Sequence, residues 1–500
     1  MSKQVIVIGA GPGGLTAAMI LAAHGYRVEV LEKQPRVGGR NAALKVGDYT
    51  FDVGPTFLMM KDVLVKVFQL AGRRVEDYLT LREVDPLYRL VYGDRRTFRP
   101  SRLDREGTVR QIEELFPGNA AGYWRYLERE RVKHDHLVPC LQVPYGSYLD
   151  VFRMRLLKAL PWLDVHQSLI DELGRYFQDD DLRIAFTFQA KYLGMSPWEC
   201  PGLFSIISFL EQDGGIWHPF GGLNRISAAM ADVVAEHGGT VETSTPVERL
   251  LVEGGRAVGV VLEDGEERRA DHVVLNADFA QAMSRLVEPR LLKRWHPDRL
   301  ARKKYSCSTF MLYLGVDRIY DDLEHHSILF SEDYERNIRE VAVSKTLSAD
   351  PSVYIQNACV TDPGLAPPGK STIYMLVPVP NLTGSIDWAK EAPAFREKVL
   401  TLAETRGGFI GLRDHIEVER MIVPTQWRDE LDVYNGATFN LAHNIGQMLW
   451  WRPHNRFEEI DDLYLVGGGT HPGSGLPTIY ESGRISSELI LQRDGRQLGA

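Results

Sequence analysis

The residues best suited to chemistry are three glycines near the N-terminus, Gly9, Gly11 and Gly14, which form a GxGxxG pattern. In a dinucleotide site the first glycine permits a tight turn, the second lets a pyrophosphate approach bare backbone, and the third lets the next helix pack closely. Free N–H groups at the start of that helix hold the phosphates. Glu32 stands eighteen residues after Gly14, where an acidic side chain accepts hydrogen bonds from ribose hydroxyls. The pattern predicts a dinucleotide site.

The elements needed to position these residues are present in the surrounding sequence. Residues 5–8 form a short β-branched run, which predicts a buried parallel strand. Apolar residues then recur at helical spacing from Leu15 to Ala22, and residues 26–31 predict a second strand that ends at Glu32. A lone GxGxxG is weak evidence. The strand before it, the helix after it and the acidic residue beyond the next strand make the interpretation specific.

The next segment indicates which dinucleotide binds. Residues 33–40 end in Gly39 and Arg40 and resemble an extension in the amine-oxidase-like flavoprotein superfamily, where a glycine pair and an arginine lie beside the FAD diphosphate. Gly54 and Pro55 stand in a stretch that is also similar to that superfamily, whose glycine at this point lies near the isoalloxazine ring. The resemblance implies FAD rather than a nicotinamide cofactor. No second GxGxxG that would indicate a built-in nicotinamide site is apparent.

The most specific segment is 463–477, a predicted strand followed by a turn with five glycines and two prolines, and then by a helix. It resembles the signature of the bacterial-type carotenoid desaturases, the phytoene and diapophytoene desaturase family. Residues 451–456 and 47–56 are similar to that family as well, so the resemblance covers essentially the whole chain. It implies that four residues of the turn contact FAD, namely Gly468, Gly475, Leu476 and Pro477.

The chain departs from the family pattern at two places. Asp462 stands where the signature usually has Asn or Gly, and residues 478–481 replace a Gly-Val-Ile type run of many phytoene desaturases. These departures leave the FAD site intact but leave the substrate and the oxidation product open. His471, held between Thr470 and Pro472 in the glycine-rich turn, is interpreted as a structural rather than a catalytic residue.

The middle of the chain returns to the predicted cofactor domain. A strand over 247–252 precedes a hairpin with a turn at Asp264-Gly265, and the stretch closes on an apolar strand that runs into Ala277. The resemblance implies that Val247 meets the adenine through its backbone and that Ala277 lies near the diphosphate.

The order of these elements predicts the fold class, an α/β protein in which a Rossmann-like FAD-binding domain is interleaved with a mixed α+β substrate domain. We assign residues 1–79, 215–285 and 441–500 to the FAD-binding domain. Residues 80–214 and 286–440 are assigned to the substrate domain, which would also face the membrane.

Composition narrows the function classes. The 500 residues carry a formal net charge of −9, which argues against a nucleic-acid partner. The four cysteines are far apart and the paired histidines lack further ligands, so we expect no metal site. The uncharged stretch 4–24 is interrupted by glycines, which argues against a signal peptide or spanning helix. A cytoplasmic protein is expected.

The predicted substrate domain suits a long hydrocarbon, because aromatic residues gather around 427–457 and residues 204–210 are nearly all apolar. Segment Tyr148–Trp162 mixes apolar and basic residues, which is typical of an interfacial helix. An amphipathic core helix fits the pattern nearly as well. We expect peripheral, monotopic attachment to the cytoplasmic membrane, with four apolar residues as candidates: Phe152, Leu156, Leu160 and Trp162.

The resemblance implies an FAD-dependent desaturase that adds conjugated double bonds to a long apolar isoprenoid, phytoene or diapophytoene. An allylic CH2–CH2 unit would lose hydride to flavin N5 and a proton from the neighbouring carbon, and a quinone or dioxygen would reoxidise the flavin. The delocalised cation makes a strong base unnecessary, and no residue is named as one. Two alternatives stay open. One is a carotenoid oxygenase or isomerase of the same fold, and the other is a non-catalytic flavin-binding membrane accessory protein.

Overall fold

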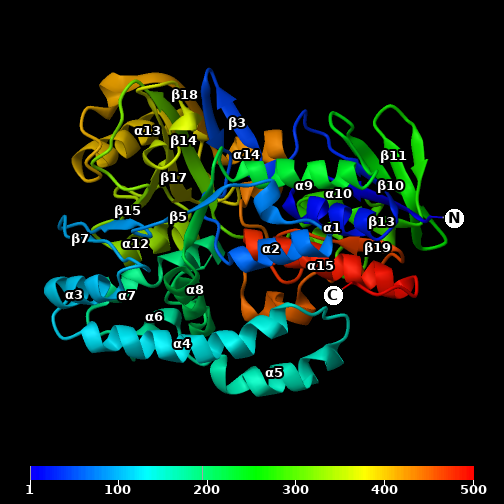
Figure 1. Ribbon diagram of the computed structural model, residues 1–500, viewed down its shortest axis with the longest axis horizontal. Coiled ribbons are helices and arrows are strands. Elements are labelled where there is room, and N and C mark those ends of the chain that lie inside the picture. Colours follow the sequence, from blue (N-terminus) through cyan, green and yellow to red (C-terminus); the bar gives the residue numbers. More distant parts are fainter. Residues whose placement is uncertain (1, 194, 500) are drawn as a thin grey trace.

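The computed structural model describes residues 2–193 and 195–499. Two sheets lie side by side, and a layer of helices runs beneath them, with α4 and α5 along the lower edge of Figure 1. The fold class predicted from the sequence, α/β with a Rossmann-like domain, is confirmed.

The first sheet is a five-stranded parallel sheet in the order β19-β13-β1-β2-β9. Its strands are β1 (Gln4–Ile8), β2 (Arg27–Leu31), β9 (Thr240–Glu242), β13 (His272–Leu275) and β19 (Leu463–Leu465). The inner strands are almost wholly apolar because both faces of the sheet are covered. Val7 and Val274 pack under three helices on one face, and Ile6 and Val273 pack against a small antiparallel sheet on the other. The three helices are α1 (Pro12–Ala23), α9 (Asn224–Glu236) and α15 (Leu476–Arg493), and the small sheet consists of β10 (Val247–Glu253), β11 (Arg256–Leu262) and β12 (Glu267–Arg269).

The second sheet has seven strands in the order β18-β14-β17-β16-β15-β6-β7, and all its pairs are antiparallel except β15 with β6. Its strands are β6 (Arg89–Val91), β7 (Thr97–Phe98), β14 (Ser308–Val316), β15 (His326–Leu329), β16 (Val353–Asn357), β17 (Ser371–Val379) and β18 (Ile416–Ile422). Helix α13 (Trp388–Thr405) covers one face, where Phe395 packs on Phe310 with ring centroids 5.0 Å apart. The opposite face looks toward the helical layer.

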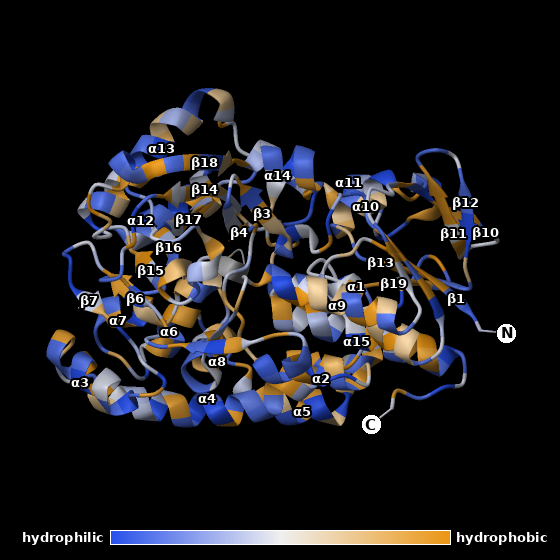
Figure 2. Ribbon diagram, turned by 45° about the horizontal axis from the view of Figure 1, so that its top comes forward, coloured by the Kyte–Doolittle hydropathy of each residue, from blue (hydrophilic) through white to orange (hydrophobic). Residues whose placement is uncertain are grey.

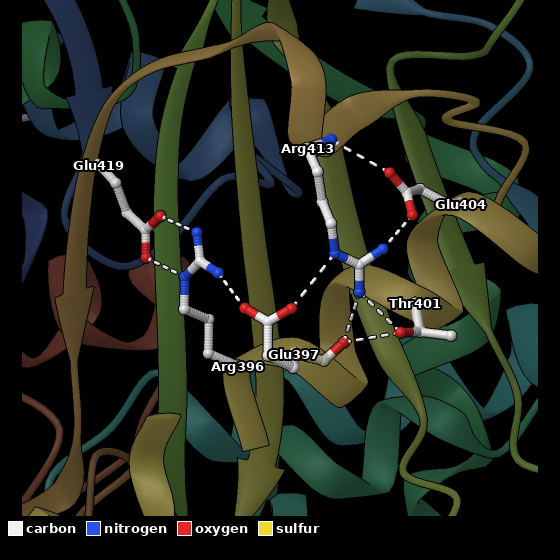
Figure 3. Close-up of polar contacts among 6 residues, drawn as sticks. All are labelled: Arg396, Glu397, Thr401, Glu404, Arg413 and Glu419. Carbon is white, nitrogen blue, oxygen red and sulfur yellow. Dashed lines mark hydrogen bonds and ion pairs between the residues drawn. The ribbon is translucent and has the colours of Figure 1, made fainter. Parts of the chain in front are cut away.

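An ion-pair network fastens α13 to the edge of this sheet (Figure 3). Arg396 binds both carboxylate oxygens of Glu419 on β18, at 2.6 and 2.5 Å. Arg413 donates to the hydroxyl of Thr401 at 2.7 Å and also pairs with Glu404. The network therefore ties the helix to the strand that follows it along the chain.

The helical layer consists of α3 (Arg105–Leu115), α4 (Ala120–Leu141), α5 (Met154–Ala159), α6 (Leu169–Leu173), α7 (Asp180–Ala185) and α8 (Ile206–Gly214). A buried cluster fixes α4 within it. Nζ of Lys133 lies 2.8 Å from Glu130, 3.0 Å from Asp164 and 3.9 Å from Glu172, and all four side chains are almost fully excluded from solvent. Among the described residues, no helix combines the length and the apolar character needed to cross a bilayer.

Segment Tyr148–Trp162 corrects one prediction, because it is not a single interfacial helix. It consists of two short 3-10 turns, Tyr148–Phe152 and Leu160–Trp162, on either side of α5. Phe152 and Leu160 are exposed, but Leu156 is buried, and Trp162 is covered by a stacked His136 ring and by Arg129. In Figure 2, apolar and hydrophilic residues are mixed along α4 and α5.

The remaining elements pack around the two sheets. They are α2 (Lys61–Leu70), β3 (Ala43–Val46), β4 (Tyr49–Asp52), β5 (Leu81–Val84), β8 (Ile216–Pro219), α10 (Phe279–Arg285), α11 (Pro297–Leu300), α12 (Tyr334–Arg339) and α14 (Pro424–Leu431). The strands of the parallel sheet come from three separated stretches of chain, and those of the seven-stranded sheet come from the stretches between them. The domain boundaries themselves stay a prediction.

Candidate active site

One cavity of about 690 Å3 joins the two halves of the molecule. Its polar end lies against the turns that follow β1, β2 and β13, where the carboxyl ends of parallel strands meet and ligands of open α/β sheets bind. Its apolar end runs along the inner face of the seven-stranded sheet toward α4, α5 and α8. The volume is within the range of small-molecule and cofactor sites, which is about 300–1,000 Å3.

The turn after β1 is built for close backbone approach. Gly9 has a φ of +94°, and a Cβ placed there would lie 2.3 Å from the carbonyl oxygen of Asn276. A Cβ on Gly14 would lie 2.4 Å from the carbonyl oxygen of Gly9, so this glycine serves the packing of helix on strand. Gly11 lines the cavity at the start of α1. The first N–H groups of that helix have no partner within the helix, so its N-terminus favours an anion.

Glu32 stands at the end of β2 with its side chain almost fully buried. Its two oxygens accept hydrogen bonds from the backbone N–H groups of Ala10, at 2.7 Å, and Gln34, at 2.8 Å. Burial raises the pKa of Glu32, and these two hydrogen bonds oppose the rise. The carboxylate thus fixes the shape of the glycine turn and still has lone pairs for a ligand.

Arg40 is held over the same end of the cavity by three groups. One of its terminal nitrogens donates to the carbonyl oxygen of Thr438 at 2.8 Å and lies 3.8 Å from the carboxylate of Asp278. The amide of Asn440 bridges the pair, accepting from Arg40 at 2.9 Å and donating to Asp278 at 2.9 Å. Burial raises the pKa of Asp278, and the charge of Arg40 opposes the rise.

The C-terminal glycine-rich turn lies opposite the first turn. Arg452 is fully buried and donates to the carbonyl oxygens of Gly468 at 2.7 Å and Thr470 at 3.0 Å; burial lowers the pKa of Arg452 to about 9. His443 accepts the N–H of Ser474 at 3.1 Å. Arg452 supports the turn from behind, whereas His443 and several glycines of the turn line the cavity.

His471 lies inside the protein rather than among the cavity-lining residues. Its ring packs edge-on against Tyr145, with ring centroids 5.1 Å apart. Burial lowers the pKa of His471 to about 3, so the imidazole stays neutral. This placement supports the structural interpretation of the residue.

Of the fourteen residues predicted to bind the cofactor, thirteen line the cavity: Gly9, Gly11, Glu32, Gly39, Arg40, Gly54, Pro55, Val247, Ala277, Gly468, Gly475, Leu476 and Pro477. Gly14 lies beneath them in the contact between helix and strand. The structure also brings Asn276, Asp278 and Asn440 to this site, which the sequence analysis missed. The polar residues on either side of Ala277, directly after a buried strand, were the signal that could have identified the first two.

The apolar end is lined by side chains from α4, α5, α8, β14, β17, α14 and the loop around residue 445. The main apolar members are Leu137, Leu141, Leu156, Phe204, Ile207, Leu210, Met311, Leu376, Trp427, Phe439, Leu449 and Trp451. Val165, Ile445 and Trp451 also line this end and are 44–48% exposed, so the cavity reaches the surface here. The 3-10 turn over Tyr148–Phe152 contacts the turn over Leu449–Trp451, which places the exposed residues around α5 beside this opening.

The polar end fits a flavin dinucleotide, because a Cβ on its glycines would clash within the turn, the helix N-terminus favours a diphosphate, and the buried carboxylate of Glu32 lines the cavity at the end of β2. Comparisons with known proteins agree. Residues 12–491 match the family model described as flavin containing amine oxidoreductase. A 4,4'-diapophytoene desaturase (4,4'-diapolycopene-forming) of Methylomonas sp is 50% identical over 98% of this chain and 96% of its own. An all-trans-zeta-carotene desaturase of Myxococcus xanthus is 40% identical over 99% of this chain and 94% of its own.

Among solved structures, an oxidoreductase from Methanosarcina mazei shares the fold with a TM-score of 0.64 at 19% identity, over 96% of this chain and 99% of its own. The chain belongs to the flavin-containing amine oxidoreductase family and is an FAD-dependent enzyme. Within that family it is an oxidoreductase of the carotenoid desaturase type. The family, cofactor and enzyme class predicted from the sequence are confirmed.

Proposed function

We propose that the enzyme introduces conjugated double bonds into an acyclic isoprenoid hydrocarbon, with 4,4'-diapophytoene as the preferred substrate and phytoene as the second candidate. The observation that carries this proposal is the single cavity that leads from the glycine turns into a wall of apolar side chains. The 50% identity to a diapophytoene desaturase favours the first substrate, and the 38% identity to a zeta-carotene-forming phytoene desaturase of Myxococcus xanthus supports the second.

The residues at the polar end would hold FAD. Glu32 would bind the ribose, Gly11 and the start of α1 the diphosphate, and Val247 the adenine. Arg40 would lie beside the diphosphate, and its fixed position between Thr438, Asp278 and Asn440 would keep it there without side-chain reordering. When bound, FAD supplies the oxidation by accepting a hydride.

The apolar end would position the substrate. A hydrocarbon offers no polar group, so shape and burial of apolar surface are the only means of binding it. Each side chain fully covered by the substrate contributes on the order of 1.5–3 kcal/mol. The same lining excludes water from the reacting carbons.

The surface around α5 would take the substrate from a lipid bilayer. The apolar residues exposed there are Tyr148, Leu149, Phe152, Met154, Leu157 and Leu160. Arg153, Arg155 and Lys158 are exposed among them, which is the mixture of an interfacial segment. Because these residues lie beside the opening of the cavity, peripheral attachment to the cytoplasmic membrane would deliver the substrate directly to it.

Reconstitution tests this function. The protein with FAD is mixed with liposomes that contain diapophytoene or phytoene, anaerobically with a quinone or in air, and the extracted pigment is measured by its absorption spectrum. We expect long-wavelength conjugated products with quinone or dioxygen as the acceptor, and faster turnover of diapophytoene. An oxygenated product would favour an oxygenase, an unchanged double-bond count with altered geometry would favour an isomerase, and no flavin reduction by substrate would favour a binding protein.

A further inference from the structure

One segment next to the seven-stranded sheet also borders the polar end of the cavity. We call this segment, residues 430–440, the strap. Just before it, the indole of Trp427 donates to the carbonyl oxygen of Thr309 at 3.0 Å, and at its end the carbonyl oxygen of Asn440 accepts the N–H of Ser306 at 3.0 Å. The strap is therefore fastened to the seven-stranded sheet at both ends. Its members that line the cavity are Leu431, Asp432, Thr438, Phe439 and Asn440.

Asp432 connects the strap to two cations that belong to the parallel sheet. One carboxylate oxygen pairs with Lys33, and the other accepts a hydrogen bond from Arg285 at 3.0 Å. Lys33 follows β2, whereas Arg285 ends α10, the helix that follows β13. Strands β2 and β13 lie on either side of β1 in the sheet. The bridge from Lys33 through Asp432 to Arg285 thus joins the two flanks of the glycine turn after β1, and all three residues line the cavity.

This bridge differs from the contacts that hold the backbone of the strap. The side chain of Gln34 donates to the carbonyl oxygen of Glu430 at 3.1 Å, and Arg40 donates to that of Thr438 at 2.8 Å. The three side chains of the bridge, in contrast, are 29–54% exposed. Ion pairs between exposed side chains contribute little to stability and are screened by salt. The bridge can therefore open while the backbone contacts of the strap persist.

We propose that Asp432 is a latch, which with Lys33 and Arg285 closes the strap over bound FAD and so controls how fast the cofactor enters and leaves. This inference rests on the cofactor placement proposed above, with the diphosphate at the turn after β1 and the ribose at Glu32. It does not depend on the identity of the substrate. A cofactor in that placement lies between the strap and the parallel sheet, so it passes this side of the cavity only when the bridge is open.

A latch and a direct contact with FAD differ in their kinetic effect. A direct contact stabilises the bound state, so its loss speeds release without speeding uptake. A latch hinders passage in both directions, so its loss speeds release and uptake together and changes the dissociation constant less than either rate. The charges give a second distinction. Without the carboxylate of Asp432, Lys33 and Arg285 would attract the anionic cofactor more strongly, which by electrostatics alone would slow its release.

Three substitutions break the bridge, namely Asp432→Asn, Lys33→Met and Arg285→Met. Asp429→Asn and Arg428→Met are the matched controls, because these two residues form an exposed ion pair on α14 and are not among the residues that line the cavity. Release is followed on diluted holoenzyme by the rise in flavin fluorescence. Uptake is followed by stopped-flow mixing of apoprotein with FAD, and circular dichroism checks the fold of each variant.

We expect each bridge variant to release FAD about 3- to 10-fold faster, as fits the loss of weak, exposed ion pairs, and to take it up faster as well. Both controls should keep the wild-type rates. Release from Asp432→Asn at or below the wild-type rate would overturn the proposal.

If Asp432→Asn fails to fold, uptake by Arg285→Met decides, because the loss of a cation without a latch would slow the uptake of an anion. A Gly11→Val variant that still binds FAD would refute the cofactor placement instead.

Discussion

The side-chain amide of Asn276 donates a hydrogen bond of 3.0 Å to the carbonyl oxygen of Gly9, which joins the end of β13 to the turn after β1. The same amide nitrogen would lie 2.7 Å from a Cβ placed on Gly11. Gly11 is thus enclosed by the protein on one side and borders the cavity on the other.

Gly11→Val should abolish FAD binding, because the branched side chain would occupy the backbone surface that the diphosphate approaches. Asn276→Ala removes the protein contact that a Cβ on Gly11 would make. The double variant therefore shows whether the bound diphosphate or the packing against Asn276 requires a glycine at this position. We expect the double variant to fold and still to lack the flavin absorbance. Recovery of the flavin spectrum would show that packing against Asn276, rather than the ligand, requires the glycine. Gly214→Val, at a site with open space, is the control.

Glu32→Gln should weaken FAD binding by about ten- to a hundredfold, since a charge-assisted hydrogen bond contributes about 1.5–3 kcal/mol. The amide oxygen can accept from Ala10 or Gln34 but not from both, so one buried N–H would face an NH2 group. We therefore also expect a lower melting temperature for the apoprotein. Isothermal titration and calorimetry measure the two effects, with Glu29→Gln on the same strand as the control. An unchanged dissociation constant would place the ribose elsewhere.

Phe152→Glu combined with Leu160→Glu should release the protein from liposomes, because both side chains are more than half exposed beside the cavity opening. FAD content should remain normal, and turnover of liposome-held substrate should be lost. Flotation with liposomes measures the attachment. Ile410→Glu alters an equally exposed apolar residue in the loop after α13 and should stay bound. Retention of the double variant on the liposomes would move the contact to another surface.

Glu211 on α8 should make stability fall as the pH rises. It is fully buried, accepts from Gln189 at 2.6 Å and Tyr88 at 3.1 Å, and burial raises its pKa from 4.5 to about 8. Between those values the folded state binds a proton that the unfolded chain has released, so each pH unit lowers stability by about 1.4 kcal/mol. Glu211→Gln should remove this slope in urea unfolding at pH 5, 6 and 7. Parallel profiles for the two proteins would contradict the prediction, and Glu335→Gln, at an exposed position on α12, is the control.

Much of the fold could be predicted where the local sequence pattern and the tertiary contacts favour the same secondary structure. The strand over residues 5–8, the glycine turn and the strand that ends at Glu32 form one contiguous unit, so short-range periodicity was sufficient to place them. At Asp462, where the chain departs from the family pattern, the residue type also suits the local backbone conformation. Its φ is +58°, and the left-handed region is one that Gly, Asn and Asp tolerate best. The departure therefore preserves the backbone shape.

The other features of the fold and the site depend on contacts between residues far apart in the sequence, which no local pattern predicts. Leu156 and Leu160 are four residues apart, which places them on one side of an ideal helix. The chain changes to a 3-10 turn at Leu160, and Leu156 is buried whereas Leu160 is exposed. The clamp on Arg40 likewise takes Thr438, Asp278 and Asn440 from distant parts of the chain. Such assemblies follow from topology rather than from spacing.

The interleaving of the chain has a consequence for how the enzyme is made. Strand β19 and helix α15 supply one wall at the polar end of the cavity, and α15 packs directly on α1, yet both are translated long after the first glycine turn. A nascent chain therefore carries its first glycine turn with that wall missing until β19 and α15 have been translated. Cofactor loading must wait for these two elements, and a truncation shortly before residue 463 should leave a chain that flavin cannot rescue.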